Sequence, residues 1–162
     1  MKKIWFVIVW IALGLMSHQV QGQWALRGGY TYQLNNFAEV GVGLITKKIK
    51  PSHDFVTLRI PERVNSVFLS TEFNFTSDFI LGGKLGYEIA WIRWAPVTAR
   101  LNYAYYTNFK KQDMRIIPEA GVNLFGFLHL TYGYNIPLQA IEFEAISRSR
   151  ISLIIVKDFS KK

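Results

Sequence analysis

The chain has 162 residues, half of them hydrophobic, with no cysteine and a formal net charge of +8. This length suits one domain, and the lack of cysteine excludes disulfides, thiolate chemistry and cysteine-ligated metals. The basic balance indicates anionic counter-charges, unless the lysines only solvate loops; the export signal described next argues against nucleic acid as a partner.

The first residues have the organisation of a secretory signal. Two lysines are followed by an apolar run, Ile4–Met16, and then by a polar stretch. Val20 and Gly22 suit the −3 and −1 positions of a signal peptidase site, and the apolar run is shorter than the ~20 residues that a spanning helix needs. We therefore expect a cleaved signal peptide over 1–22 and one domain over 23–162.

Two-residue alternation runs through the rest of the chain. In 67–75, and again in 85–91, one face carries mostly apolar and aromatic residues and the other mostly polar, charged or small ones. Successive side chains of a strand point to opposite faces. An apolar, aromatic face opposite a charged one is typical of a transmembrane β-barrel, with lipid outside and a polar lumen inside.

The pattern predicts an all-β fold, an eight-stranded antiparallel up-and-down transmembrane β-barrel. Asn35-Asn36, Ser77-Asp78 and Gly126 supply turn signals between strands. The expected strands are 24–33, 37–46, 66–76, 79–91, 95–107, 114–125, 127–136 and 148–159.

The connection 47–65 is the main departure from this plan. It is longer than the short periplasmic turn expected there, and 55–60 within it alternates like a strand. It extends the neighbouring strands or forms an extra hairpin or plug; a ninth strand is disfavoured because single-chain bacterial barrels have even strand counts. Its basic residues are candidates for binding anionic headgroups or a partner: Lys47, Lys48, Lys50, Arg59 and Arg63.

The polar faces of the strands predict a packed ionic interior. Basic and acidic residues occur there in equal numbers, which suits buried charges because these persist only when paired. Interior side chains just fill an eight-stranded barrel, so we expect no open pore. The inward set is Arg27, Glu39, Glu72, Lys84, Glu88, Arg100, Glu119, His129 and Arg150.

Several of the strand patterns carry a resemblance to a known family. The segments 70–75, 79–87, 102–109, 118–121 and 132–137 are similar to small outer-membrane β-barrel proteins common in Bacteroidetes. These segments are strand patterns and not catalytic signatures. The resemblance implies the barrel fold and a location in the outer membrane of a Gram-negative bacterium.

One constellation is similar to that of outer-membrane lipid A deacylases, in which a His and a Ser lie two residues apart on a strand with a Glu downstream. Here His129 and Thr131 have that spacing, and Glu142 or Glu144 follows; a base, a hydroxyl and an orienting carboxylate are the minimum for acyl transfer. Thr replaces Ser, both residues fall on the inward face, and the Asn that follows the hydroxyl residue in that family is missing. The alternative is a lumen histidine hydrogen-bonded to a neighbouring carboxylate.

The sequence predicts no metal site and no cofactor. Outside the signal, His53 and His129 are far apart and have no carboxylate at ligand spacing. We therefore expect a structural, adhesive or complex-scaffolding role, with outer-membrane lipid, lipopolysaccharide and an envelope protein complex as partners. The alternatives are a lipid A-modifying outer-membrane enzyme, a narrow channel, or a soluble lipocalin-like carrier, which would need apolar residues inside and polar ones outside.

Overall fold

The computed structural model describes residues 22–49, 63–74, 79–92, 96–139 and 143–159. Every regular element among them is a β-strand, and all strands belong to one antiparallel, eight-stranded sheet. The pairing of β4 with β5 joins the two ends of that sheet and closes it into a barrel. The strands are β1 (Gln23–Ile49), β2 (Arg63–Asn74), β3 (Leu81–Trp91), β4 (Val97–Thr107), β5 (Gln112–Leu124), β6 (Leu128–Tyr134), β7 (Ile136–Pro137) and β8 (Ile146–Asp158).

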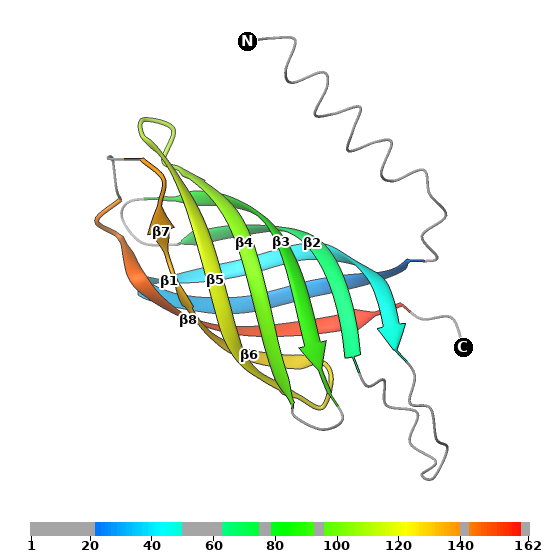
Figure 1. Ribbon diagram of the computed structural model, residues 1–162. Helices are drawn as coiled ribbons and strands as arrows, with labels where there is room; N and C mark the ends of the chain where they lie inside the picture. Colours follow the sequence, from blue (N-terminus) through cyan, green and yellow to red (C-terminus); the bar gives the residue numbers. More distant parts are fainter. Residues whose placement is uncertain (1–21, 50–62, 75–78, 93–95, 140–142, 160–162) are drawn as a thin grey trace.

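The long element β1 supplies two neighbouring positions in the barrel wall. Arg27 Nε lies 4.0 Å from Glu39 Oε1, although the two residues would be ~40 Å apart on one extended strand. The chain reverses at Leu34, whose φ is 73°. Residues 25–34 pair with β8 and residues 37–49 with β2, and Figure 1 shows the two halves, blue and cyan, side by side.

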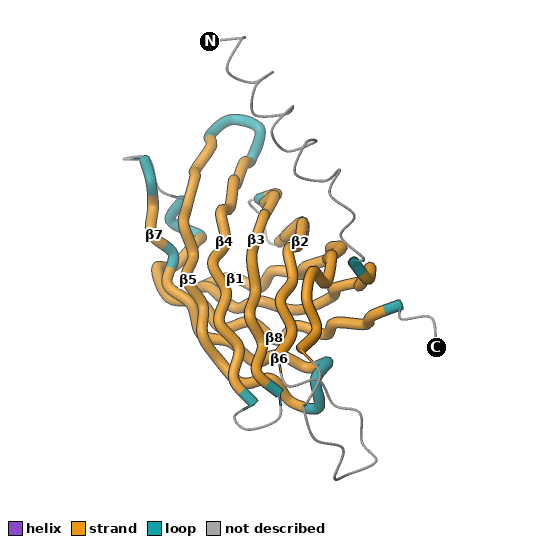
Figure 2. Tube along the Cα trace, turned by 45° about the vertical axis from the view of Figure 1, so that its right-hand side comes forward, coloured by secondary structure: helices purple, strands orange, loops and turns teal. Residues whose placement is uncertain are grey.

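The barrel is therefore a meander, as the alternation predicts. Its wall runs from the first half of β1 through the second half, β2, β3, β4, β5 and β6 to β8, which returns to the first half. The two-residue β7 pairs with β5 just beyond β6, so β6 and β7 together correspond to the predicted strand 127–136. Figure 2 shows β2 to β5 running side by side along one wall.

The hairpin of β1 and β2 is longer than predicted. Lys47, Lys48 and Ile49 pair with Asn65, Val64 and Arg63, so both strands extend into the connection 47–65. This agrees with one of the alternatives raised by the sequence, extension of the neighbouring strands. The remainder of that connection lies outside the described residues, as does nearly all of the predicted signal peptide.

The two ends of the barrel differ in composition. At the turn end, where β1 reverses and β4 leads into β5, apolar side chains fill the interior. We call this cluster the apolar plug: Phe37, Ile80, Ala104, Tyr106, Ile117, Phe143 and Ile146. At the opposite end, which we call the terminal end, the described chain starts and stops (Figure 1).

Candidate functional site

The middle of the barrel is occupied by paired charges. Glu39 and Glu72 face each other across the β1–β2 pair, an arrangement of two like charges that needs a cation between them. Lys84 on β3 provides it, because its Nζ donates to both carboxylates, at 2.7 Å from Glu72 Oε1. The Arg150 guanidinium also donates to Glu72, and the Tyr106 hydroxyl donates to Glu72 Oε2 at 2.6 Å.

A second group of charges centres on Glu88 and lies nearer to the terminal end. Its Oε2 accepts from Arg100 Nε and, at 3.3 Å, from Arg27 Nη1. His129 Nδ1 lies 3.3 Å from Glu88 Oε1. Arg100 Nη1 donates to Glu119 Oε2 at 3.4 Å, because Glu88, Arg100 and Glu119 occupy matching register positions on β3, β4 and β5.

Glu119 joins the two groups into one ionic network. Arg150 Nε lies 3.3 Å from Glu119 Oε1, on the side opposite Arg100. All nine residues that the alternation placed inward are buried in this interior: Arg27, Glu39, Glu72, Lys84, Glu88, Arg100, Glu119, His129 and Arg150. Among them, four basic residues match four acidic ones in number. Such mutual pairing is the condition on which buried charges are retained.

Glycines make room for the long charged side chains. A Cβ added at Gly133 on β6 would lie 2.6 Å from Glu119 Cγ and 3.1 Å from Arg150 Cγ. A Cβ at Gly82 would lie 2.6 Å from the Tyr106 ring. The network therefore depends on these small residues as well as on the charged ones.

The sequence interpretation missed one buried ion pair, Asp113 with Arg115. Arg115 Nη2 and Nε donate to Asp113 Oδ2 at 2.6 and 2.9 Å, and Arg115 Nη1 donates to the Ile146 carbonyl at 3.2 Å. The Phe143 amide also donates to Asp113, at 3.3 Å, so the pair ties the plug to the wall. The expected strand began at residue 114 and left out Asp113. Arg115 lay within that strand, at the same alternation as Glu119, but was not assigned to the inward set.

The described residues of the possible acyl-transfer site, His129 and Thr131, contact different carboxylates. His129 faces Glu88, whereas the Thr131 hydroxyl donates to Glu119 Oε2 at 2.9 Å, and both residues are buried inside the barrel. Glu144 is exposed beside the plug, at the turn end, while His129 lies toward the terminal end. Glu142 lies outside the described residues. No relay of histidine, hydroxyl and carboxylate is assembled among the residues that the structure describes.

The predicted basic surface is described only in part. Arg63, the first residue of β2, donates through Nε to Asn65 Oδ1 at 2.9 Å, and its guanidinium lies 5.6 Å from the centre of the Trp91 ring. The backbones of Lys47 and Lys48 belong to β1, while Lys50 and Arg59 lie outside the described residues.

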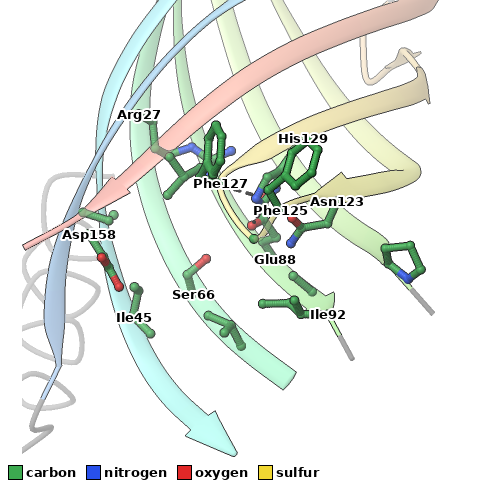
Figure 3. Close-up of a pocket in the computed structure, with 17 residues that line it drawn as sticks. Arg27, Ile45, Ser66, Glu88, Ile92, Asn123, Phe125, Phe127, His129 and Asp158 are labelled. Carbon is green, nitrogen blue, oxygen red and sulfur yellow. Dashed lines mark hydrogen bonds and ion pairs between the residues drawn. The ribbon is translucent and has the colours of Figure 1, made fainter. Parts of the chain in front are cut away.

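A cavity of about 610 Å³ opens at the terminal end (Figure 3). Figure 3 shows Arg27, Glu88 and His129 close together, with Ile45 and Ser66 further toward the strand ends. Most of the other lining side chains are apolar: Ala25, Val64, Ala90, Ile92, Phe125, Phe127 and Val156. The floor of the cavity is thus the outer layer of the ionic network, and the wall of the cavity is mostly apolar.

Two kinds of feature are absent from the described parts of the chain. These parts contain no group of three or more histidine or acidic side chains that would hold a metal ion. They also contain no helix long and apolar enough to cross a membrane. Comparison with protein-family models, with curated proteins and with solved structures found no match to this chain.

Proposed function

We propose that this protein is an integral outer-membrane β-barrel of a Gram-negative bacterium, with a structural, adhesive or complex-scaffolding role and no open pore. The observation that carries this proposal is an inside-out distribution of side chains. Arg150 and Glu72 are at most 1% exposed, whereas Leu69 and Leu101 on the outer face are 59% and 57% exposed. In a protein surrounded by water the reverse is the rule, and apolar patches of this extent mark a lipid or protein contact.

The order of residues along the outer face supports a membrane. Aliphatic side chains such as Leu101 and Leu153 occupy the middle of the outer wall. Exposed tyrosines toward the turn end include Tyr32, Tyr103 and Tyr134, and the exposed aromatic residues Trp24, Trp91 and Phe159 lie toward the terminal end. Aromatic girdles on both sides of an aliphatic band are typical of membrane barrels. Strands of 11 to 13 residues, as in β2 to β5 and β8, are long enough to cross while tilted.

The filled interior supports a role without conduction. The apolar plug occupies the turn end, and the ionic network occupies the middle of the barrel. An eight-stranded barrel has an interior that side chains just fill. The outer wall and the two rims are then the surfaces through which the protein would act, toward lipid, lipopolysaccharide or an envelope complex.

Membrane fractionation combined with a heat-modifiability gel tests the proposal. We expect recovery in the outer membrane, and different migration of boiled and unboiled protein, because a closed barrel resists unfolding in detergent. Recovery as a soluble periplasmic protein would contradict the proposal and favour the lipocalin-like carrier.

Planar-bilayer recording tests the second part of the proposal. We expect the purified protein to leave bilayers silent, because the plug and the network block the lumen. Reproducible stepwise conductance would contradict the assignment of a closed interior and favour the channel alternative.

A further inference from the structure

We propose that the hairpin between β4 and β5 docks onto the headgroups of an anionic lipid bilayer. It does so through a surface that we call the hairpin tip: Phe79, Phe109, Lys110 and Lys111. This inference rests on the proposed function, because the headgroups concerned are those of the membrane in which that function places the barrel. It adds which part of the molecule meets the headgroups and which lipid chemistry that part selects.

Phe109 is held at the turn of the hairpin in an unfavourable backbone conformation. Its φ is 66°, in the left-handed region that bulky L-residues rarely adopt. The side chain is nevertheless 78% exposed, so the described fold gains little burial in return. Residues in such conformations cluster at sites of function. The ring of Phe109 is therefore available to a partner outside the described chain.

Hydrogen bonds fix the turn that carries this ring. Asn108 Oδ1 accepts from the amides of Lys110 and Lys111, at 3.2 and 2.7 Å. The Thr107 hydroxyl accepts from the Phe109 amide at 3.0 Å. Figure 2 shows the turn projecting beyond the ends of β2 and β3. Because the turn is already ordered and projects from the barrel, it loses little conformational entropy when it binds.

The hairpin tip presents an apolar surface beside two positive charges. Phe79, just before β3, is exposed, and its ring stacks on that of Phe109 with the centroids 6.4 Å apart. The side chains of Lys110 and Lys111 are exposed and form no hydrogen bond or ion pair with any residue that the structure describes. Apolar contact and lysine charge together bind anionic lipid. Lysine is depleted at protein interfaces, so the combination favours lipid headgroups over a protein partner.

The position of the hairpin tip along the barrel also matches the headgroup layer. Leu101 lies midway along β4 on the outer face, at the level expected for the bilayer midplane. Phe109 lies about 26 Å further along the chain, at about 3.3 Å per residue, or about 20 Å along the axis of a barrel whose strands tilt by about 40°. The headgroup layer extends from about 15 to about 22 Å from the midplane. The ring and both lysines thus fall at the level of the lipid phosphates.

Site-directed fluorescence in nanodiscs tests this docking. The chain has no cysteine, so Gln112→Cys, at an exposed position beside the hairpin tip, carries a single environment-sensitive label. Discs of phosphatidylcholine are compared with discs of equal parts phosphatidylcholine and phosphatidylglycerol, both containing a lipid with a nitroxide headgroup as quencher. We expect stronger quenching in the mixed discs, because only their surface carries the net negative charge that attracts the two lysines.

Variants of the hairpin tip make the test specific. Lys110→Gln combined with Lys111→Gln should lower the ratio of docked to free tip by about 30-fold, since each lysine contributes about fivefold near an anionic surface. Phe109→Ser should also lower this ratio, because it removes the apolar contact. Phe125→Ser is the control, since Phe125 is similarly exposed at a φ of 58° but lies at the opposite end of the barrel. Equal quenching in the two kinds of disc, or in the wild type and the tip variants, would overturn the proposal.

A second label position separates this proposal from the proposed function. Leu101→Cys carries the label to the middle of the outer wall, where we expect blue-shifted emission in both kinds of disc because hydrocarbon surrounds it. Blue-shifted emission there, together with equal quenching at Gln112 in the two kinds of disc, would overturn the docking and leave the membrane barrel standing. Emission typical of water at Leu101 would contradict both proposals.

Discussion

At the scale of single residues, Glu72 links four strands of the barrel. From β2 it accepts hydrogen bonds from Lys84 on β3, Tyr106 on β4 and Arg150 on β8. Arg150 in turn donates to the Thr31 hydroxyl of β1, at 3.2 Å. The carboxylate is therefore a point at which opposite walls of the barrel are held together by charge-assisted hydrogen bonds.

Removing this carboxylate should be strongly destabilising. Glu72→Ala leaves Lys84 and Arg150 buried with a deficit of negative charge, and we expect the free energy of unfolding to fall by about 3–5 kcal/mol. Urea unfolding followed by tryptophan fluorescence measures the change. The exposed Glu144→Ala is the control and should stay within about 0.5 kcal/mol. A Glu72→Ala loss no larger than that of the control would argue that the interior is hydrated and not packed.

The sequence predicts which charged residues face inward, but it does not predict which of them form ion pairs with each other. Alternation alone put Glu39, Glu72 and Lys84 on one face, since period two is a local property. That Lys84 lies between the two glutamates depends on the register of three strands, which no local pattern fixes. The bond between Arg150 and Glu72 spans the barrel and depends on its closure.

At the scale of elements, the tight reversal in β1 is a point of backbone strain. Leu34 has a φ of 73° and an exposed side chain, so it occupies the left-handed region without evident packing in return. Such a conformation costs an L-residue about 1–2 kcal/mol, and asparagine tolerates it better.

Replacing this leucine should stabilise the hairpin. We expect Leu34→Asn to raise the free energy of unfolding by about 0.5–1 kcal/mol, and Leu34→Ile to lower it, because a β-branched side chain is least tolerated at positive φ. Equilibrium urea unfolding of the two variants gives the comparison. The opposite order would mean that the leucine side chain makes a contact outweighing its backbone cost.

The close approach of β5 and β6 provides a second test at this scale. A Cβ at Gly121 would lie 2.0 Å from the Leu130 carbonyl oxygen and 2.6 Å from Thr131 Cα, both backbone atoms of β6. We expect Gly121→Ala to cost about 1–3 kcal/mol, since the strands must move apart. Gly83→Ala is a matched control because nothing lies within 4 Å of its Cβ position. Equal stability of the two variants in the same unfolding assay would refute the predicted crowding.

The strands were predictable to different degrees. Those with unbroken alternation, such as β3 and β4, were expected close to their observed bounds. The expected start of β5 also differed from the observed one by only two residues, but this was enough to leave out Asp113, the partner of Arg115. The extension of β1 and β2 was left open as one of several alternatives, since the residues at the hairpin's end carry no apolar periodicity to mark them.

At the scale of the whole molecule, the interior has three layers along the barrel axis. The apolar plug occupies the turn end, the ionic network the middle, and the cavity the terminal end. The alternation indicated a polar inside and an apolar outside, but it gave no order along the axis. That order arises because the strands are staggered, so residues at different positions along each strand meet at one level.

The outer face allows a substitution whose effect depends on the surroundings of the barrel. Leu101 lies midway along β4 on that face, and Val97 lies on the same face at the strand's end. In a bilayer, arginine at the midplane costs about 2–4 kcal/mol and near the interface only about 0–1. In water, an arginine at either exposed position costs nearly nothing. We therefore expect Leu101→Arg to destabilise the protein in phospholipid vesicles far more than Val97→Arg, as measured by denaturant unfolding. If both variants unfold like the wild type, the apolar outer face is not in contact with lipid, and a partner protein must cover it instead.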